Sequence, residues 1–438
     1  MKYIRTYGDY NSWKLDYSNP DRGFRLKPTL YKYPHGEDNI LLENDDPRKH
    51  GDSTYMRIYI GSDTEFSFYI GNKSGDTQTT MKCTIDWGDG VIEDKNITAD
   101  GKGFKLSHNY TGRNFREIEL YNVERDYSIV GDSTNYTSLI SHPSIVKNVI
   151  LGNSVVNIGE DAFGGFEGGC TSLTSVHIPE SVTSIGERAF YYCESLTSIY
   201  IPEGVTSIGT NAFYGCSSLT SVHISESVTS IGGGVLGECT SLISIHIPEG
   251  VTTIGNSTLY NCTSLTSVYI PEGVTSIGSD TFIGCSSLIS VYIPESVTKI
   301  GGGAFNYCTG LTSVNIPESV TSIGGSAFSN CTGLTSINIP EGVTSISNVF
   351  MGCSSLTSIL IPERVTEILN YAFDNCTSLI SISSLNTTAP TLGLFDSGQY
   401  TIFTNLPKNG TLHIKPGATG YDAWLKSLPS GWTIVEDL

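Results

Sequence analysis

The sequence predicts a mainly β protein: a solenoid of about ten 23-residue repeats, preceded by a small β-sandwich and followed by a capping segment. Three observations support this fold class. Ten cysteines recur at a nearly constant spacing, the residues between them repeat one apolar pattern, and the preceding segment contains short runs of alternating polar and apolar residues. With 38% apolar and only 16% charged residues, the chain has enough apolar side chains to bury a core.

The cysteines mark the repeat. Successive members are 23 residues apart, except for a step of 22 between Cys331 and Cys353. The ladder comprises Cys170, Cys193, Cys216, Cys239, Cys262, Cys285, Cys308, Cys331, Cys353 and Cys376. We interpret it as structural packing, because a free cysteine behaves as a small buried hydrophobe. Disulfides or a bound metal are the alternatives, but stacked Cβ atoms would lie further apart than a disulfide prefers, and no Cys-x-x-Cys pair occurs.

The repeat unit predicts one coil of a solenoid. It reads Cys-x-x-Leu-x-Ser-(Val/Ile)-x-Ile-Pro-Glu-x-Val-Thr-x-Ile-Gly-x-x-Ala-Phe-x-x. Residues 175–179 alternate between polar and β-branched apolar types, which favours a short strand that ends at the proline. A single coil cannot bury its own apolar side, so we expect the coils to stack into a continuous core.

This unit resembles the BspA-type (Treponema-type) leucine-rich repeats over residues 146–385. The resemblance implies a right-handed leucine-rich-repeat solenoid with a parallel sheet on its concave side. It also implies a non-enzymatic surface protein that acts in adhesion. The first copy departs from the pattern by four extra residues before Cys170.

The segment 56–125 predicts a small antiparallel β-sandwich. Alternating strands are expected at 56–60, 65–70, 81–85 and 116–120. The run Asp86-Trp87-Gly88-Asp89-Gly90, with His108-Asn109-Tyr110 further on, resembles the PKD module of the immunoglobulin-like class. That resemblance implies a core tryptophan and a hairpin turn. For Asp86 and Asp89 we favour a role in the turn, and Ca²⁺ binding is the alternative.

The remaining segments are assigned from their composition. Residues 1–55 mix aromatic side chains with charges and prolines and are expected to anchor the protein to a partner. Residues 126–145 are expected to form a linker and an N-terminal cap. Residues 386–438 predict a C-terminal cap with a strand at 411–414, a helix at 421–426 and a strand at 432–435, covering the last open strand edge.

Charge excludes one class of partner. The formal net charge is −19, and residues 136–438 carry 7 Lys and Arg against 22 Asp and Glu. A polyanion would be repelled, so nucleic acid is not expected to bind. The sequence contains no apolar run that predicts membrane insertion and no signal peptide at its start, so we expect a location in a virion or, alternatively, on a bacterial cell surface.

The candidate contact residues form a ladder at the fifth position counted from the repeat leucine. We expect the third, fifth and seventh positions of each strand to face outward, and the fifth is the varied one. Its ligand-contact candidates are His177, Tyr200, His223, His246, Tyr269, Tyr292, Asn315 and Asn338, followed in the chain by Leu360 and Ser383. Tyr and His tips suit a sugar or a protein loop. The alternative is that these residues only have a high strand propensity.

No catalytic site, metal site or cofactor is expected. His223 and His246 lie one coil apart but lack further metal ligands on the neighbouring ladders, which offer Ser and Thr. A glutamate follows the Ile-Pro of the strand in nine copies. We interpret these glutamates as a solvated edge of the solenoid. A row of carboxylates that binds divalent cations is the alternative. No Ser–His–acid set and no phosphate-binding glycine loop stands out.

These features together predict a non-enzymatic binding or adhesion protein. We expect a structural component of a gut-bacterial phage virion (fibre, tail or head decoration) whose concave face contacts a glycan or a protein on the host surface. Residues 1–55 would contact other virion proteins, and an oligomer is possible. A bacterial cell-surface BspA-like adhesin is the main alternative, and an intracellular protein-interaction scaffold is a weaker one.

Overall fold

The computed structural model describes residues 56–61, 65–72, 80–87, 91–98, 104–109, 115–121, 127–129, 146–165, 169–393 and 402–438. The chain divides into two units, residues 1–50 and residues 51–438, and all of the described residues belong to the second. The predicted anchoring segment 1–55 therefore lies outside the described residues.

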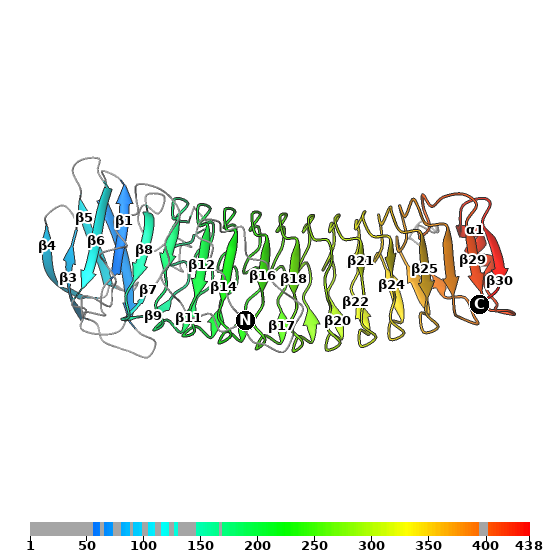
Figure 1. Cartoon of the computed structure of the whole chain (residues 1–438), viewed down its shortest axis with the longest axis horizontal. Coiled ribbons are helices and arrows are strands. Elements are labelled where there is room, and N and C mark those ends of the chain that lie inside the picture. The colour runs from blue at the N-terminus through cyan, green and yellow to red at the C-terminus, as the bar shows by residue number, and fades with distance from the viewer. Residues whose placement is uncertain are drawn as a thin grey trace, which may run out of the picture. The chain divides into compact units, whose positions relative to one another are not determined.

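The second unit is a parallel β-solenoid of about twelve turns, in which coils follow one another in chain order (Figure 1). Most coils contribute a first strand to one sheet and a shorter second strand to another. The first strands are β8 (Val146–Leu151), β10 (Ser175–His177), β12 (Ser198–Ile201), β14 (Ser221–Ile224), β16 (Ser244–His246), β18 (Ser267–Tyr269), β21 (Ser313–Val314), β23 (Ser336–Ile337), β25 (Ser358–Ile361) and β27 (Ser381–Ser384). The second strands are β9 (Val155–Ile158), β11 (Ser184–Ile185), β13 (Ser207–Ile208), β15 (Ser230–Ile231), β17 (Thr253–Ile254), β19 (Ser276–Ile277), β20 (Lys299–Ile300), β22 (Ser322–Ile323), β24 (Ser345–Ser347), β26 (Glu367–Leu369) and β28 (Thr391–Leu392).

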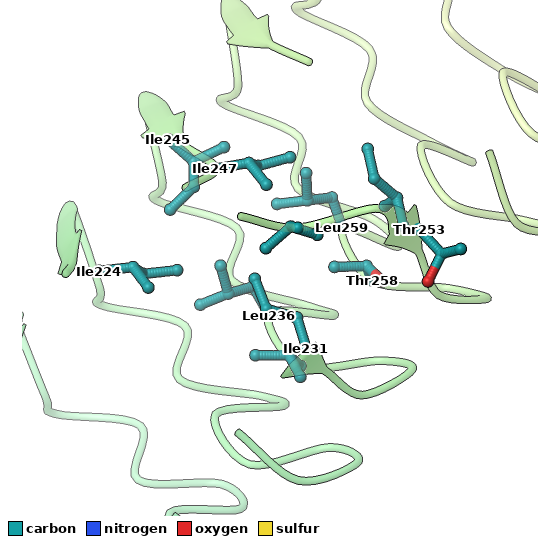
Figure 2. Close-up of a pocket in the computed structure, with 11 residues that line it drawn as sticks. Ile224, Ile231, Leu236, Ile245, Ile247, Thr253, Thr258 and Leu259 are labelled. Carbon is teal, nitrogen blue, oxygen red and sulfur yellow. The ribbon is translucent and has the colours of Figure 1, made fainter. Parts of the chain in front are cut away.

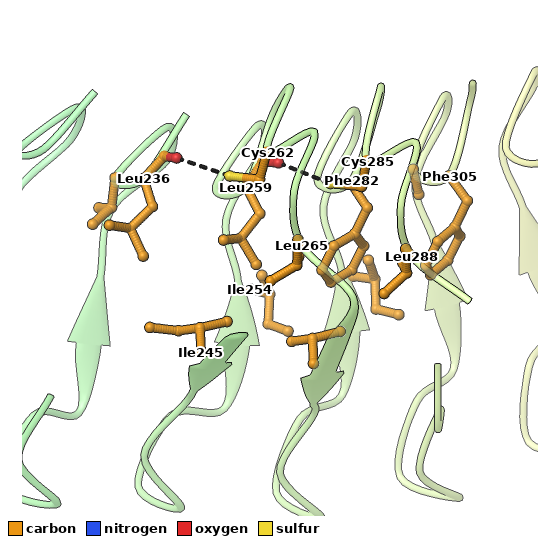
Figure 3. Packing of buried hydrophobic residues seen from close by; sticks show 14 of the residues in the cluster. Leu236, Ile245, Ile254, Leu259, Cys262, Leu265, Phe282, Cys285, Leu288 and Phe305 are labelled. Atoms are coloured by element: carbon orange, nitrogen blue, oxygen red, sulfur yellow. Dashed lines mark hydrogen bonds between the residues drawn. The ribbon is translucent and has the colours of Figure 1, made fainter. Parts of the chain in front are cut away.

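The core of the solenoid is built from the same repeat positions in every coil. Stacked phenylalanines form its main column, with ring centroids 5.1 Å apart between Phe282 and Phe305 and 5.2 Å between Phe305 and Phe328. The repeat leucines and cysteines beside this column are fully buried. Figure 3 shows Phe282, Phe305, Leu265 and Leu288 in adjacent coils, directed into the same interior. The predicted continuous core is confirmed.

The phenylalanine column is interrupted where two coils carry leucine instead. Leu236 and Leu259 replace phenylalanine, and an apolar cavity of about 10 Å³ lies beside them. Its lining includes Ile224, Ile245 and Ile254 (Figure 2). A space of this size with almost no polar lining cannot hold a hydrogen-bonded water, so the interruption is a packing defect and offers no ligand site.

The one repeat of 22 residues lacks a residue in the turn between its second strand and its phenylalanine. The coil between Cys331 and Cys353 has 22 residues, and the centroid distance there widens to 6.2 Å between Phe328 and Phe350. Asn348 keeps the left-handed backbone conformation of this turn position, with a φ of 56° compared with 61° at Ser326, and its buried Oδ1 atom has no hydrogen-bond partner among the described residues. The deletion therefore shortens the turn but leaves the stacking of the coils intact.

Most coils are packed backbone to backbone against their predecessors at the glycine that follows the second strand. A Cβ atom on Gly301 would lie 2.4 Å from the Ser279 nitrogen, and one on Gly209 would lie 2.5 Å from the Glu187 nitrogen. This close approach explains the Ile-Gly pair in the repeat. In the turn that follows, one residue adopts left-handed backbone dihedral angles. Gly303 is an example, with a φ of 63°.

A buried ion pair joins the first two coils. Arg188 Nε lies 2.9 Å from Asp161 Oδ1, and its Nη2 atom lies 3.1 Å from Asp161 Oδ2. Asp161 is fully buried and Arg188 is 6% exposed. Because an unpaired buried charge is costly, neither residue could be removed alone without a large loss of stability.

The N-terminal strands continue the two sheets of the solenoid. The strands are β1 (Met56–Gly61), β2 (Glu65–Asn72), β3 (Thr80–Asp86), β4 (Ile92–Thr98), β5 (Phe104–Asn109), β6 (Phe115–Tyr121) and β7 (Tyr127–Ile129). β1 pairs antiparallel with both β6 and β8, and β7 joins β2 to β9. The hydrogen-bonded sheets thus cross the predicted boundary between sandwich and solenoid, and part of the predicted linker 126–145 forms a strand.

The predicted hairpin around Trp87 agrees with the structure. β3 pairs antiparallel with β4, and Trp87 between them is fully buried, with its ring stacked on His108 at 4.9 Å. The Trp87 Nε1 atom donates a hydrogen bond of 2.8 Å to Glu93. Asp89 and the side chain of Asp86 lie outside the described residues, so their predicted turn role and the Ca²⁺ alternative both stay predictions.

The C-terminal segment forms the predicted strand, helix and strand: β29 (Thr411–Ile414), α1 (Asp422–Ser427) and β30 (Thr433–Glu436). Phe403 and Trp424 extend the aromatic column, with centroids 5.6 Å apart, and Trp424 Nε1 donates to the Pro390 carbonyl. β29 pairs in parallel with β27 and so covers the edge of the last repeat strand, while β30 becomes the new edge of the sheet among the described residues.

We predict that Phe305→Ala lowers the free energy of unfolding by about 3–5 kcal/mol, because it empties a site in the centre of the column. Urea denaturation followed by circular dichroism measures the change. Thr312→Ala, on the exposed surface of the same region, is the control and should change stability by less than about 1 kcal/mol. Equal effects of the two variants would contradict the assignment of the core.

Candidate binding surface

The fifth-position ladder lies along one surface of the solenoid, in the order of the coils. Parallel pairing aligns Tyr200 with His223, His246 with Tyr269, and Tyr292 with Asn315. We call the surface formed by the outward side chains of the first strands the strand face. The exposed ladder members are His177, His223, His246, Tyr269, Tyr292 and Asn315, while Tyr200 and Asn338 are half-buried. That these residues contact a ligand stays a prediction.

The rings of the ladder stack on one another. Tyr200 and His223 have centroids 4.8 Å apart and planes 7° apart, and His246 and Tyr269 have centroids 6.1 Å apart and planes 10° apart. These separations follow from the spacing of neighbouring strands. Within each pair the facing sides of the rings are covered, so the outer faces, the edges and the polar tips remain for other contacts.

The glutamates that follow the strands contact the tips of these rings. Tyr292 Oη donates a hydrogen bond of 3.0 Å to Glu272, and His246 Nε2 lies 2.8 Å from Glu226 Oε1. In each pair the glutamate belongs to the preceding coil. All nine glutamates are exposed: Glu180, Glu203, Glu226, Glu249, Glu272, Glu295, Glu318, Glu341 and Glu363. The strand face therefore combines a ring ladder with an acidic ladder.

Hydrogen bonds and burial shift the titration of the ladder. The hydrogen bond to Glu272 raises the pKa of Tyr292, and partial burial together with Glu249 raises the pKa of Tyr269. Burial lowers the pKa of His177. Burial also lowers the pKa of His223, and His246 lowers it further, whereas Glu226 raises it. The folded protein thus favours the neutral forms of both His177 and His223.

The side-chain amide of Asn338 forms hydrogen bonds with the backbone of the preceding coil. Its Nδ2 atom donates to the Ile316 carbonyl at 2.7 Å, and its Oδ1 atom accepts from the Ile316 amide at 3.0 Å. The side chain therefore completes the backbone hydrogen bonding of the neighbouring coil, where the regular strand has already ended at Val314. This gives Asn338 a structural role that the sequence pattern did not indicate.

The expected set of outward positions needs a correction. The seventh position is not outward: its prolines, such as Pro202 and Pro271, are buried. The chain turns there, and the Val205 amide donates to the Pro202 carbonyl. The second position is exposed instead in the ten coils from Leu173 to Leu379, because regular alternation begins only at the third residue. The outward positions are therefore the second, third and fifth.

Sequence reasoning missed three exposed isoleucines at this second position. Ile243, Ile289 and Ile380 are 50%, 56% and 52% exposed. Most coils carry threonine there, and its hydroxyl donates to a backbone carbonyl of the preceding coil, as Thr220 does to Thr197 at 3.1 Å. The signal was present in the sequence as a departure from the threonine of the repeat.

The cysteine ladder is structural. All of the cysteines are free and buried, and the Sγ atoms of the ladder from Cys193 onward donate to backbone carbonyls of the preceding coil. Two of these contacts are shown in Figure 3, from Cys262 to Leu236 and from Cys285 to Leu259, each 3.2 Å long. Burial raises the pKa of Cys285 and of Cys331 to about 12. The packing interpretation is confirmed over the disulfide alternative.

Among the described residues, no group of three His, Cys, Asp or Glu side chains is placed to hold a metal ion. This includes His223 and His246 on the strand face. No helix in the described part of the chain has both the length and the apolar character needed to cross a bilayer.

Comparison with known proteins identifies similar repeats. The family model described as BspA type leucine rich repeat region matches residues 142–265 and 275–392 with six copies, which together span more than half of the chain. No curated protein sequence matches the chain.

Three solved structures are similar. A leucine-rich repeat protein from Bacteroides ovatus is 27% identical with a TM-score of 0.51, covering 65% of this chain and 77% of that one. A leucine rich cell surface protein from Faecalibacterium prausnitzii is 26% identical with a TM-score of 0.38, covering 82% and 99%. A leucine-rich repeat protein from T. pallidum is 29% identical with a TM-score of 0.36, covering 43% and 83%.

We predict that stability decreases as the pH falls below about 6.5, the ordinary pKa of histidine. The pKa of His223 is lower in the folded state than in the unfolded state, so as the pH falls the unfolded chain binds a proton before the folded protein does. This difference lowers the free energy of unfolding, and the decrease is complete once the pH is below the folded-state pKa. Urea midpoints measured between pH 7 and pH 5 should fall less steeply in His223→Gln than in the natural chain. A steeper fall in the variant would contradict the lowered pKa.

We also predict that the ladder thiols resist an aromatic disulfide reagent in the native protein, because burial keeps them protonated and inaccessible. All 11 cysteines should react once the chain is unfolded in guanidinium chloride. Mass spectrometry of the modified peptides locates any reaction. Rapid native labelling of Cys262 or Cys285 would contradict the packing described above.

Proposed function

Because this chain belongs to the BspA-type leucine-rich repeat family, we propose that it is a non-enzymatic binding protein that acts in adhesion. Its contact surface is the strand face, centred on the fifth-position ladder. Its partner is a protein or a glycan on a host surface. No cofactor is needed for this function, because a rigid array of side chains supplies the binding site.

The observation that supports this proposal is the contrast between the ladder and the repeat around it. Core positions are nearly invariant between coils, whereas the exposed fifth position changes from His to Tyr to Asn. Large rings with polar tips bury much surface on binding and lose little conformational freedom. Parallel pairing holds them at a fixed spacing, so the surface is preorganised.

Two placements are consistent with such a surface. We propose display on the virion of a gut-bacterial phage, with display on a bacterial cell surface as the alternative. Neighbouring genes separate them: capsid and tail genes favour the first, and secretion or lipoprotein genes favour the second. The proposed contacts of residues 1–55 with other virion proteins, and the intracellular scaffold as a weaker third placement, stay predictions.

We predict that replacing Tyr200, Tyr269 and Tyr292 by Ser together weakens binding to host cells at least tenfold, because the variant removes the largest side chains of the ladder. Binding is measured with fluorescently labelled protein and flow cytometry, after circular dichroism has confirmed the fold.

Tyr307→Ser is the matched control. Tyr307 is 53% exposed, as Tyr292 is, but it lies in the turn after the second strand and not on the strand face. The control should bind as the natural chain does. Undiminished binding of the triple variant would exclude the ladder as the contact surface.

A further inference from the structure

Four of the exposed apolar side chains of the strand face lie in three consecutive coils, and two more, Leu360 and Ile380, lie in the later coils of β25 and β27. Ile243 lies in the first, Tyr269 in the second, and Ile289 with Tyr292 in the third. The coils are directly hydrogen-bonded, from the Thr266 amide to the Ile243 carbonyl and from the Ile289 amide to the Thr266 carbonyl. We call these four side chains the apolar patch. Tyr269 is 36% exposed, and the other three are between 50% and 56% exposed.

The isoleucines of the patch lack a hydrogen bond that threonine makes at the same position. Threonine at the same position donates its hydroxyl to the preceding coil, as Thr266 does to Ile243 at 3.2 Å. Isoleucine has a similar branched shape but has no hydroxyl group to donate this hydrogen bond. Its additional apolar surface faces solvent. A contiguous exposed apolar patch of this kind is typical of a surface that contacts a partner.

The surroundings of the patch carry charge of one sign. Positions two, three, five and eight of every coil from Leu173 to Ser384 include nine glutamates and no lysine or arginine. Glu249, Glu272 and Glu295 belong to the three coils of the patch and are exposed. Glutamates one strand spacing apart repel each other, so a positively charged partner would relieve that repulsion, and an acidic one would increase it.

The stacked rings offer a sugar less open surface than isolated rings would. A sugar stacks on the open face of an aromatic ring, and the facing sides of His246 and Tyr269 are closed to it because their centroids are only 6.1 Å apart. The surface that remains consists of outer ring faces, ring edges, isoleucine methyl groups and carboxylates. Such a surface is complementary to a row of aliphatic side chains that is flanked by ammonium or guanidinium groups.

From these observations we infer that the partner is a polypeptide whose apolar side chains pack on Ile243, Tyr269, Ile289 and Tyr292 while its lysines or arginines pair with the flanking glutamates. This inference rests on the proposed function and specifies the chemistry of the partner. Acidic glycans are excluded by the same charge, and a neutral glycan is an outcome that the test can return.

The experiment measures binding of defined probes to the full chain by fluorescence anisotropy. The probe is a ten-residue peptide of alternating Lys and Leu. The comparison peptides alternate Lys with Ser, which removes the apolar side chains, and Glu with Leu, which reverses the charge. Neutral cello- and xylo-oligosaccharides are the glycan probes. We expect the Lys–Leu peptide to bind at least tenfold more tightly than either comparison peptide and than the oligosaccharides.

Variants connect this binding to the patch. Ile289→Ser combined with Tyr292→Ser should weaken the Lys–Leu peptide about tenfold, and Tyr307→Ser should leave it unchanged. Replacing Glu249, Glu272 and Glu295 by Gln should reduce the dependence of affinity on salt, because fewer charge pairs form. Glu367→Gln, in the second-strand sheet, is the matched control and should leave the salt dependence unchanged.

Two results would overturn the inference: tighter binding of a neutral oligosaccharide than of the Lys–Leu peptide, or peptide binding that the patch variants leave unaltered. Either result is distinguishable from failure of the proposed function. If the ladder triple variant loses binding to host cells while the Lys–Leu peptide fails to bind, the strand face remains the contact surface and only the chemistry of its partner is wrong. If the triple variant keeps its binding to host cells, the proposed function fails, whatever the peptides do.

Discussion

Parallel hydrogen bonding between equivalent residues of successive coils places each repeated side chain next to its counterpart one strand away. In the pair of β12 and β14, Ser198, Ile199 and Tyr200 lie opposite Ser221, Val222 and His223. A shift of one residue along the strand would turn buried residues such as Ile199 outward and ladder residues such as Tyr200 inward. The phenylalanine column, the thiol contacts, the acidic ladder and the ring ladder all follow from this single alignment.

Stacking of this kind makes departures from the repeat informative. Leucine for phenylalanine at 236 and 259 leaves a small apolar cavity, and the missing residue near Asn348 widens the ring spacing. Both changes occur in the interior, where they reduce packing and create no chemical site. The isoleucines at 243 and 289 depart from the repeat at the surface, where the cost is a hydrogen bond and the result is exposed apolar area. That difference in location separates the packing defects from the candidate contact surface.

The two ends of the solenoid are extended by strands of different kinds. At the N-terminal end, antiparallel strands such as β1 pair directly onto β8, so the N-terminal strands and the coils share their sheets. At the C-terminal end, β29 and β30 continue the parallel sheet while Phe403 and Trp424 close the aromatic column. The strand face of the coils therefore lies between strands that continue the hydrogen bonding at both ends.

The sequence by itself determined the solenoid, its repeat length, its core positions and the order of the ladder, because each coil repeats the same local pattern and only one register buries all of its apolar residues. Tertiary structure alone decided how neighbouring coils use their side chains. Three kinds of contact join residues that are 20 to 23 positions apart. They are the bonds of Asn338 to the Ile316 backbone, the stacking of ladder rings, and the hydrogen bond from Tyr292 to Glu272. The exposure of the second position in place of the seventh also depends on where the chain turns at the buried proline, and this turn is set by packing against the adjacent coil. Periodicity identifies which residues recur, but contacts between coils depend on directions in space that a one-dimensional pattern does not contain.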